Sequence, residues 1–271
     1  MGLLGCIVQI LFPWKTKTAK YAGNWDWQSK QPLSYRLQQR LLRNTLLTHN
    51  MQALVYGKWA DCNRNILPFF TASYSETEKK MLQEQPSMNP MRLVFVGSLS
   101  SHKHPMLAAQ IVKHLLDAGH KLSLTFLGEG PERKNLEYYI KDHSLEESIQ
   151  LLGNVDSQKV KSELNKAHFL IFLSRSEGWP KVVAEAMFWG CVPITTCVSC
   201  VPYMLGEGQR GALVDPNIDS TVTAIEAYLA DPSKYYKHRE AAAEWSRQFT
   251  LERFEREIIK LLLPNKTSVK R

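Results

Sequence analysis

The chain has 271 residues, of which 44% are apolar, 22% charged and 10% aromatic, the composition of a globular protein with one large or two small domains. Lys and Arg number 34 against 26 Asp and Glu, and the net charge of +8 favours acidic partners such as phosphates or an anionic membrane face. The basic residues form no nucleic-acid-binding motif, and five cysteines, an odd number, argue against a disulfide scaffold. Nucleic-acid-binding proteins and small disulfide-stapled proteins are therefore excluded first.

The chain begins with "MGLLGCIVQILFPWK", which is apolar for about twelve residues. Such a run is too short for a spanning helix of ~20 residues, and it lacks the basic start of a signal peptide. We interpret it as a core segment that has lost what normally precedes it. A helix lying on a membrane surface is the alternative.

The first 88 residues predict about half of an α/β domain, with two or three strands and one long amphipathic helix. The "SETE" stretch at 75–78 has a capping-box spacing that predicts a short helix, and 81–90 is typical of a linker. The strands are expected at 19–23, 51–57 and 66–70, and the amphipathic helix at 33–47.

From residue 91 onward, short apolar runs alternate with helical patterns. This alternation predicts right-handed crossovers and a parallel sheet, forming one doubly wound α/β domain over about 90–230. Ligands of such sheets bind beyond the carboxyl ends of the strands. The strands are expected at 91–97, 121–128, 149–153, 168–174 and 192–196, and the helices at 105–119, 131–143, 156–167, 181–190, 219–230, 233–248 and 251–263.

The stretch "SRSEGWPKVVAEAMFWG", Ser174 to Gly190, concentrates the chemistry. Pro180 suits the first helical position, so the helix after it presents unpaired N–H groups, an anion site, at a strand's carboxyl end. Glu177 precedes this helix and Glu185 lies inside it. Their carboxylates can accept hydrogen bonds from sugar hydroxyls while the helix end holds phosphate.

These residues, "EGWPKVVAEAM", resemble the paired-glutamate motif of family 4 retaining glycosyltransferases, which have the GT-B fold of two facing Rossmann-like domains. Four further stretches resemble the family in the same order over much of 91–250: "FVGSLSSHK", "LGEGPE", "IQLLGNV" and "GALVDP". The resemblance implies a GT-B protein with one complete doubly wound domain and a partial N-terminal one. It also implies that 1–88 is the acceptor-side domain, 89–250 the nucleotide-sugar donor domain, and 251–271 a crossover helix with a tail.

The resemblance assigns roles to named residues. Glu177 would contact hydroxyls of the donor sugar, and Lys103 would neutralise the diphosphate as charge builds on the leaving group. Glu185 would hold the ribose, and Asn154 and Val155 would lie near the base. The remaining donor-binding positions are Gly97, Ser98, Gly128, Gly130, Gly178, Trp179, Lys181 and Val182.

Three departures from the family pattern concern the donor site. Ser98 stands where the family has an Arg, and His102, Arg175 or Lys181 are alternative replacements for that cation. Pro180 stands where Gly is most common and removes one N–H. The segment "VSCVPYML" lacks the glycines and the Glu of the family's second binding loop.

The implied function is transfer of a sugar with retention, from a UDP- or GDP-linked donor to a sugar or lipid-linked sugar acceptor. The expected setting is cell-surface polysaccharide or glycolipid biosynthesis, in the cytoplasm or at the inner face of the membrane. The donor is a substrate, and neither a cofactor nor a metal is expected. Because 1–88 resembles only the second half of a first domain, a non-catalytic nucleotide-sugar-binding remnant of a truncated transferase is the alternative.

Two other classes are disfavoured. Cys197 and Cys200 have the spacing of a metal or redox pair, but no further ligands lie nearby in the sequence. A dinucleotide-dependent oxidoreductase would need Gly-x-Gly-x-x-Gly, and "GEGPER" does not supply it.

Overall fold

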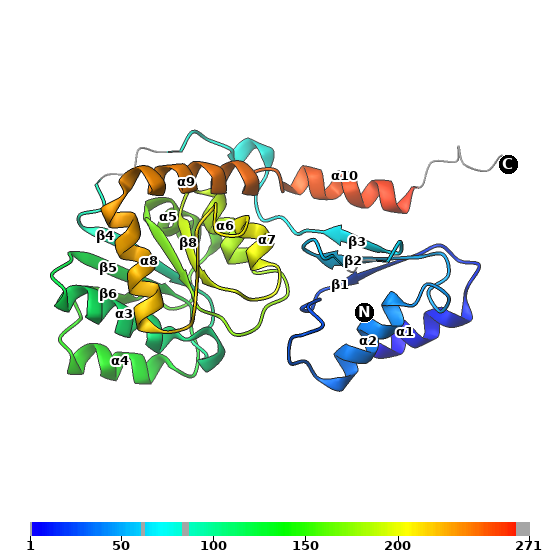
Figure 1. The fold of residues 1–271 in the computed structure, drawn as a ribbon, viewed down its shortest axis with the longest axis horizontal. Coiled ribbons are helices and arrows are strands. Elements are labelled where there is room, and N and C mark those ends of the chain that lie inside the picture. Colours follow the sequence, from blue (N-terminus) through cyan, green and yellow to red (C-terminus); the bar gives the residue numbers. More distant parts are fainter. Residues whose placement is uncertain (1, 61–62, 83–86, 264–271) are drawn as a thin grey trace. The chain divides into compact units, whose positions relative to one another are not determined.

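A computed structural model describes residues 2–60, 63–82 and 87–263 of the chain. The chain folds into two compact units (Figure 1). The first unit comprises Met1–Glu76, Glu177–Trp179 and Phe249–Arg271, and the second comprises Thr77–Ser176 and Pro180–Gln248.

The second unit is built on a six-stranded parallel sheet in the order β6-β5-β4-β7-β8-β9. The chain starts in the middle at β4, moves outward through β5 to β6, and returns to β7 beside β4. This is the doubly wound Rossmann order, and its reversal between β4 and β7 creates the crevice in which such folds bind ligands. The strands are β4 (Met91–Val96), β5 (Leu122–Leu127), β6 (Ile149–Leu151), β7 (Phe169–Phe172), β8 (Val192–Thr196) and β9 (Ala212–Val214).

Helices of the second unit form two groups, α3, α4 and α8 in one and α5, α6 and α9 in the other (Figure 1). Because helices cover both faces, every residue of β7 and β8 is buried, as expected for central strands of a parallel sheet. These helices and the short turns between them are η3 (Ser101–Lys103), α3 (Pro105–Asp117), α4 (Arg133–Asp142), α5 (Ser157–Lys166), α6 (Lys181–Phe188), α7 (Val201–Leu205), α8 (Ile218–Ala230) and α9 (Pro232–Ser246).

Local chemistry explains where several of these helices begin. Asp156, Asn217 and Asp231 each accept a hydrogen bond from a backbone N–H in the first turn of α5, α8 and α9 respectively. Pro105 begins α3 and Pro232 begins α9, at positions where a missing N–H removes no helical hydrogen bond.

The first unit contains a three-stranded parallel sheet in the order β1-β2-β3. Residues alternate between its faces: Ala19 and Tyr21 join the core under α1 and α2, whereas the Lys20 Nζ lies 4.8 Å from the ring centroid of Phe254 in α10. The elements are α1 (Leu3–Val8), η1 (Gln9–Leu11), β1 (Lys17–Tyr21), α2 (Leu33–Arg43), β2 (Met51–Tyr56), β3 (Ile66–Phe69) and α10 (Leu251–Leu262).

The structure corrects four local expectations. Pro180 caps α6 with ψ 86° instead of occupying its first turn, so the helix begins at Lys181. The "SETE" segment forms only a 3₁₀ turn, η2 (Glu76–Glu78), and the segment "VSCVPYML" contains the helix α7. The residues of β9 pair with β8, which no periodicity predicted because β9 has only three residues. Part of the expected linker, 83–86, lies outside the described residues.

Candidate functional site

Two loops meet at the carboxyl ends of β4 and β7, where the strand order of the second unit reverses. The backbone N–H of Arg175, after β7, donates a 3.0 Å hydrogen bond to the carbonyl oxygen of His102, after β4. The loop after β7 is further anchored because the Thr196 hydroxyl donates to the carbonyl oxygen of Ser174 at 2.6 Å. Basic side chains from two loops more than seventy residues apart are thereby gathered at one crevice.

Lys103 lies in this crevice, in the 3₁₀ turn η3. Its Nζ is 4.9 Å from the ring centroid of Phe172, the last residue of β7, a cation–π distance. The side chain is half-buried. This contact with the end of β7 places the ammonium group at the switch point, where Lys103 is expected to neutralise phosphate.

His104 is the next residue and was not singled out by the sequence. It adopts a left-handed conformation, φ 55°, immediately before Pro105 opens α3. Burial, followed by the charges of Arg175 and His102, lowers the pKa of His104. Its Nε2 is buried and has no hydrogen-bond partner within the described part of the chain. His104 is therefore a neutral imidazole at pH 7 beside the cationic loops.

Two glycines of the expected donor site, Gly128 and Gly130, allow backbone segments to pack closely. A Cβ on Gly128 would lie 2.0 Å from the carbonyl oxygen of Gly97, and one on Gly130 would lie 2.5 Å from that of Leu99. The buried Leu99 exchanges hydrogen bonds with this turn, since its N–H donates to Glu129 and its carbonyl accepts from Glu132, both at 2.9 Å. The loops after β4 and β5 are thus interlocked.

Gly97 differs from these two glycines. Its φ is +146°, a region that favours glycine, but no atom lies within 4 Å of a Cβ built on it. Ser98, the next residue, is exposed, and its Oγ lies 3.3 Å from the Oγ of Ser100. The space over Gly97 is therefore open, as a close approach of phosphate to this backbone would require.

The start of α6 provides the second half of the expected donor site. No side chain caps its first turn, in which Lys181 is exposed and Val182 half-buried. Glu185 is half-buried one turn later. The helix is held by α9, since the Ser246 hydroxyl donates to the carbonyl oxygen of Ala184 at 2.6 Å.

Glu177, Gly178 and Trp179 belong to the first unit. Trp179 is buried, with its ring centroid 5.6 Å from that of Tyr56 and 6.2 Å from that of Phe249. A Cβ on Gly178 would lie 2.2 Å from the carbonyl oxygen of Ala22, so only glycine fits there. The side chain of Trp179 is therefore a packing residue of the first unit.

The remaining expected positions lie after β6. Asn154 is exposed and Val155 half-buried, directly before Asp156, which caps α5. Cys197 is exposed and Cys200 buried, and the described residues contain no cluster of three metal-ligating side chains. Among the same residues no helix is both long and apolar enough to span a bilayer.

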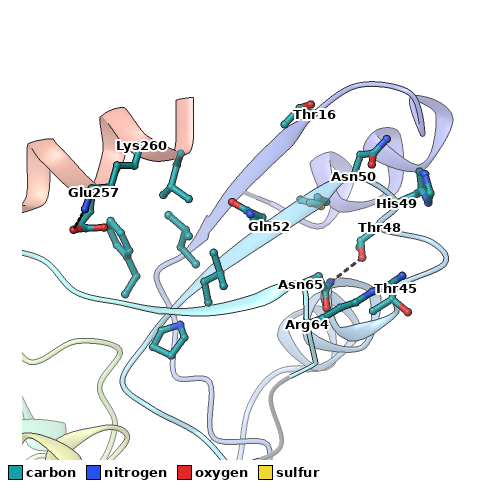
Figure 2. A pocket seen from close by; sticks show the side chains of 16 residues that line it. Thr16, Thr45, Thr48, His49, Asn50, Gln52, Arg64, Asn65, Glu257 and Lys260 are labelled. Carbon is teal, nitrogen blue, oxygen red and sulfur yellow. Dashed lines mark hydrogen bonds and ion pairs between the residues drawn. The ribbon is translucent and has the colours of Figure 1, made fainter. Parts of the chain in front are cut away.

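A cavity of about 640 Å³ lies within the first unit, and sequence reasoning did not anticipate it (Figure 2). Its lining includes residues just before β2 and β3, and also Phe69 at the carboxyl end of β3 and Glu257, Lys260 and Leu261 of α10. Asn65 forms part of its wall: its Nδ2 donates to the Leu42 carbonyl at 2.6 Å and to the Thr48 hydroxyl at 2.9 Å, while its buried Oδ1 has no partner among the described residues. The lining residues come from scattered positions between Thr16 and Leu261, a set that no local pattern connects.

The fold defines the class as an α/β protein of the doubly wound Rossmann type. Residues 76–247 match the family of glycosyl transferases group 1, and the chain belongs to that family. The solved structures that it resembles are GT-B glycosyltransferases, so the fold is GT-B in type.

Among the solved structures, HepE of Anabaena in complex with UDP has a TM-score of 0.75 at 14% identity, over 96% of this chain and 75% of that one. TarM has a TM-score of 0.68 at 15% identity, over 91% of this chain and 50% of that one. At these identities the likeness concerns the fold alone.

Curated relatives match over a shorter stretch. A phosphatidylinositol N-acetylglucosaminyltransferase subunit of Arabidopsis thaliana is 26% identical over 146 residues, which are 54% of this chain and 32% of that protein. The putative colanic acid biosynthesis glycosyltransferase WcaL of Salmonella typhimurium is 28% identical over 151 residues, 54% of this chain and 36% of that protein. The match with this chain thus covers about a third of the length of these relatives.

Proposed function

We propose that this chain is a retaining, nucleotide-sugar-dependent hexosyltransferase of family 4, acting in cell-surface polysaccharide or glycolipid biosynthesis. The donor is UDP- or GDP-linked, and the acceptor is a sugar or a lipid-linked sugar. Family membership supports the transferase class. The names of the relatives, which refer to phosphatidylinositol N-acetylglucosaminyl transfer and to colanic acid biosynthesis, support the setting.

One observation carries the donor assignment: cations gather over open backbone at the switch point. The hydrogen bond from Arg175 N–H to the His102 carbonyl joins the two loops, and Lys103 is oriented by Phe172. The backbone of Gly97 is uncovered beside them. A diphosphate has several negatively charged oxygens that accept hydrogen bonds. Cationic side chains and exposed backbone of this kind are therefore suited to binding it.

The chemistry then follows from the charge that develops. When the bond from the anomeric carbon to the diphosphate oxygen breaks, the leaving group gains negative charge, and the ammonium of Lys103 stabilises it. Glu177 accepts hydrogen bonds from hydroxyls of the donor sugar and fixes its orientation. Glu185 accepts hydrogen bonds from the ribose. These bonds contribute affinity for the nucleotide and are the same in the ground state and the transition state.

The sequence departures limit which cations can replace the missing Arg at Ser98. A backbone hydrogen bond joins the loop of His102 to that of Arg175. The charges of both residues lower the pKa of His104, so both lie near it. We propose Arg175 as the second phosphate cation, because a guanidinium remains charged at every physiological pH.

The proposed partners and location follow the same chemistry. The donor is the substrate and no separate cofactor is required, and the proposed acceptor side includes lipid-linked sugars. A transferase acting on them works in the cytoplasm, in contact with the anionic inner face of a membrane.

The experiment begins with a thermal-shift screen of the full chain against UDP, GDP, ADP and their common sugar conjugates. A ligand at a hundred times its Kd adds ~2.7 kcal/mol of stability, so a shift with one nucleotide series identifies the base. Product anomers, followed by NMR, then test retention.

Two matched variants separate binding from transfer. Glu185→Gln should weaken nucleotide binding, whereas Glu177→Gln should leave UDP binding unchanged and reduce transfer or donor hydrolysis. Negligible effects of both would contradict the paired-glutamate assignment. Nucleotide binding without any transfer would instead indicate the non-catalytic remnant.

A further inference from the structure

The first unit carries a helix whose amphipathic pattern is inverted. In α1 and η1, Leu4, Ile7, Val8 and Leu11 recur with the spacing of one helix face, and all four side chains are exposed, Leu4 by 75% and Leu11 by 68%. The opposite face carries Cys6 and Gln9 and is buried.

Backbone hydrogen bonds satisfy the amide nitrogen of Gln9 on the buried face, whereas its buried Oε1 has no partner among the described residues. The Gln9 Nε2 donates to the carbonyl oxygens of Cys6 and Leu47, at 3.2 and 3.0 Å. Turning a glutamine inward and a leucine stripe outward disfavours the free molecule in water, because the stripe would gain stability by burial. The inversion indicates that the stripe is covered when the protein functions.

The neighbouring helix α2 shows part of the same inversion, although its buried face also carries Leu42. It contacts α1, and both helices lie on one face of the sheet (Figure 1). Gln38 and Gln39 are buried, whereas Leu33 and Leu37 are exposed, Leu33 by 81%. The outward face of α2 is not purely apolar, since Arg36 and Arg40 share it at helical spacing.

Charge indicates what covers these faces. Residues 1–60 contain eight Lys and Arg against the single acidic Asp26, a net +7 that accounts for nearly all of the +8 of the whole chain. Exposed Phe12 and Trp14 form an edge-to-face pair after η1, and the exposed Lys15 follows them. Leucines interleaved with arginines and bordered by aromatic rings are typical of a helix surface lying in the headgroup region of a bilayer.

We propose that the outward faces of α1, η1 and α2, with Phe12 and Trp14, form a docking surface for an anionic lipid bilayer. The leucines enter the acyl boundary, the aromatic rings occupy the interface, and Arg36 and Arg40 bind lipid phosphates. A protein partner would have to present a face both apolar and acidic, whereas an anionic bilayer presents both by its nature. This surface deepens the proposed membrane contact and is independent of the transfer chemistry.

The first test measures co-sedimentation of the full chain, without nucleotide, with vesicles of phosphatidylcholine alone and of phosphatidylcholine mixed equally with phosphatidylglycerol. We expect binding to the mixed vesicles that weakens with added salt. The double variant R36Q/R40Q should bind them about 25-fold more weakly, at about fivefold per basic residue. The double variant L4S/L11S should lose at least tenfold.

Matched controls lie elsewhere on the surface. The exposed Leu262 and Leu263 supply L262S/L263S, and Lys134 and Lys141 of α4 supply K134Q/K141Q. Both control variants should bind the mixed vesicles as tightly as the wild-type chain does. Since every substituted side chain is exposed, the melting temperatures should agree, and UDP binding by the variants reports the donor site separately.

A second readout locates the contact. Brominated acyl chains quench nearby indoles, so vesicles containing them should quench part of the tryptophan fluorescence, and Trp14→Phe should remove that part. Equal vesicle binding by all variants would overturn the proposal. It would also be overturned by a dimer, seen by light scattering, that L4S/L11S dissociates while vesicle binding persists, since a second copy would then be the occupant.

Discussion

A side chain at Gly128 cannot coexist with the backbone of Gly97, because a Cβ there would lie 2.0 Å from the Gly97 carbonyl oxygen. Gly128 directly follows β5 and Gly97 directly follows β4, the adjacent strand of the second unit, and the Gly128 N–H donates to the Gly153 carbonyl at 2.8 Å. Three loops at the carboxyl edge of the sheet are therefore held together by direct backbone contact.

Gly128→Ala should consequently destabilise the second unit more than an alanine in open space. Gly119 is the matched control, since its φ is +87° and no atom lies within 4 Å of a Cβ there. Both variants carry the left-handed strain of ~1–2 kcal/mol, but only Gly128→Ala displaces backbone. We expect a further loss of about 2 kcal/mol or more in urea unfolding. Equal losses would mean that the loops separate easily.

Lys103→Met should lower the affinity for UDP. A charge-assisted hydrogen bond contributes ~1.5–3 kcal/mol, which corresponds to about tenfold to a hundredfold in Kd. Lys134→Met, on the exposed side of α4, is the control and should leave the Kd unchanged. Isothermal titration calorimetry measures both. A Kd for Lys103→Met within a factor of two of the unchanged protein would remove this lysine from the site.

Ser98→Arg should raise the affinity for UDP. Ser98 is exposed beside Gly97, so an arginine has room there, and a guanidinium binds phosphate in a bidentate manner. Arg175→Gln should lower the affinity, and adding Ser98→Arg should restore it at least in part. If Ser98→Arg has no effect in either background, the diphosphate lies elsewhere.

Asn65→Leu should destabilise the first unit. The change leaves the Leu42 carbonyl and the Thr48 hydroxyl without their buried donor, at a loss of ~1–3 kcal/mol for such groups. Asn63→Ala is the matched control, because Asn63 makes the same kind of bond, to the Arg43 carbonyl at 2.6 Å, but is exposed. The control should lose less than about 0.5 kcal/mol in the same unfolding measurement. A larger loss in Asn63→Ala than in Asn65→Leu would contradict this account of the cavity wall.

We expect His104 to make the free energy of unfolding decrease as the pH is lowered. Burial and the nearby Arg175 lower its pKa below 6.5, so the unfolded chain binds a proton that the folded chain still excludes. The free energy of unfolding should therefore decrease as pH falls through about 6.5. His238, whose pKa burial and Lys234 also lower, contributes with the same sign.

His104→Gln removes a titrating group and should flatten this dependence between about pH 7 and 5.5. Denaturant titrations at each pH measure the slope. An unchanged slope in His104→Gln would assign the dependence to His238 alone.

Much of the second unit could be predicted from local pattern. Alternation of apolar runs with helical spacing is determined by which side chains must be buried, so the strands from β4 to β8 and their helices lie where the sequence predicts them. Two features that differ from expectation, the place of Pro180 as the N-cap of α6 and the unpredicted three-residue β9, depend on backbone angles and strand pairing that periodicity does not encode. The helix α7 likewise interrupts a segment that was interpreted as a loop.

The tertiary structure alone decided which loops meet and which faces remain open. Arg175 and His102 are distant in the chain, and only the return of β7 to the side of β4 brings their backbones to 3.0 Å. Similarly, Leu4 and Leu11 would be assigned to a core by hydrophobicity, yet α1 turns them outward and buries Gln9, whose amide finds backbone carbonyls there. The sequence by itself determined the elements and the residue types of the site, because these depend on near neighbours. The crevice and the exposed stripe depend on contacts between distant segments, which only the folded chain defines.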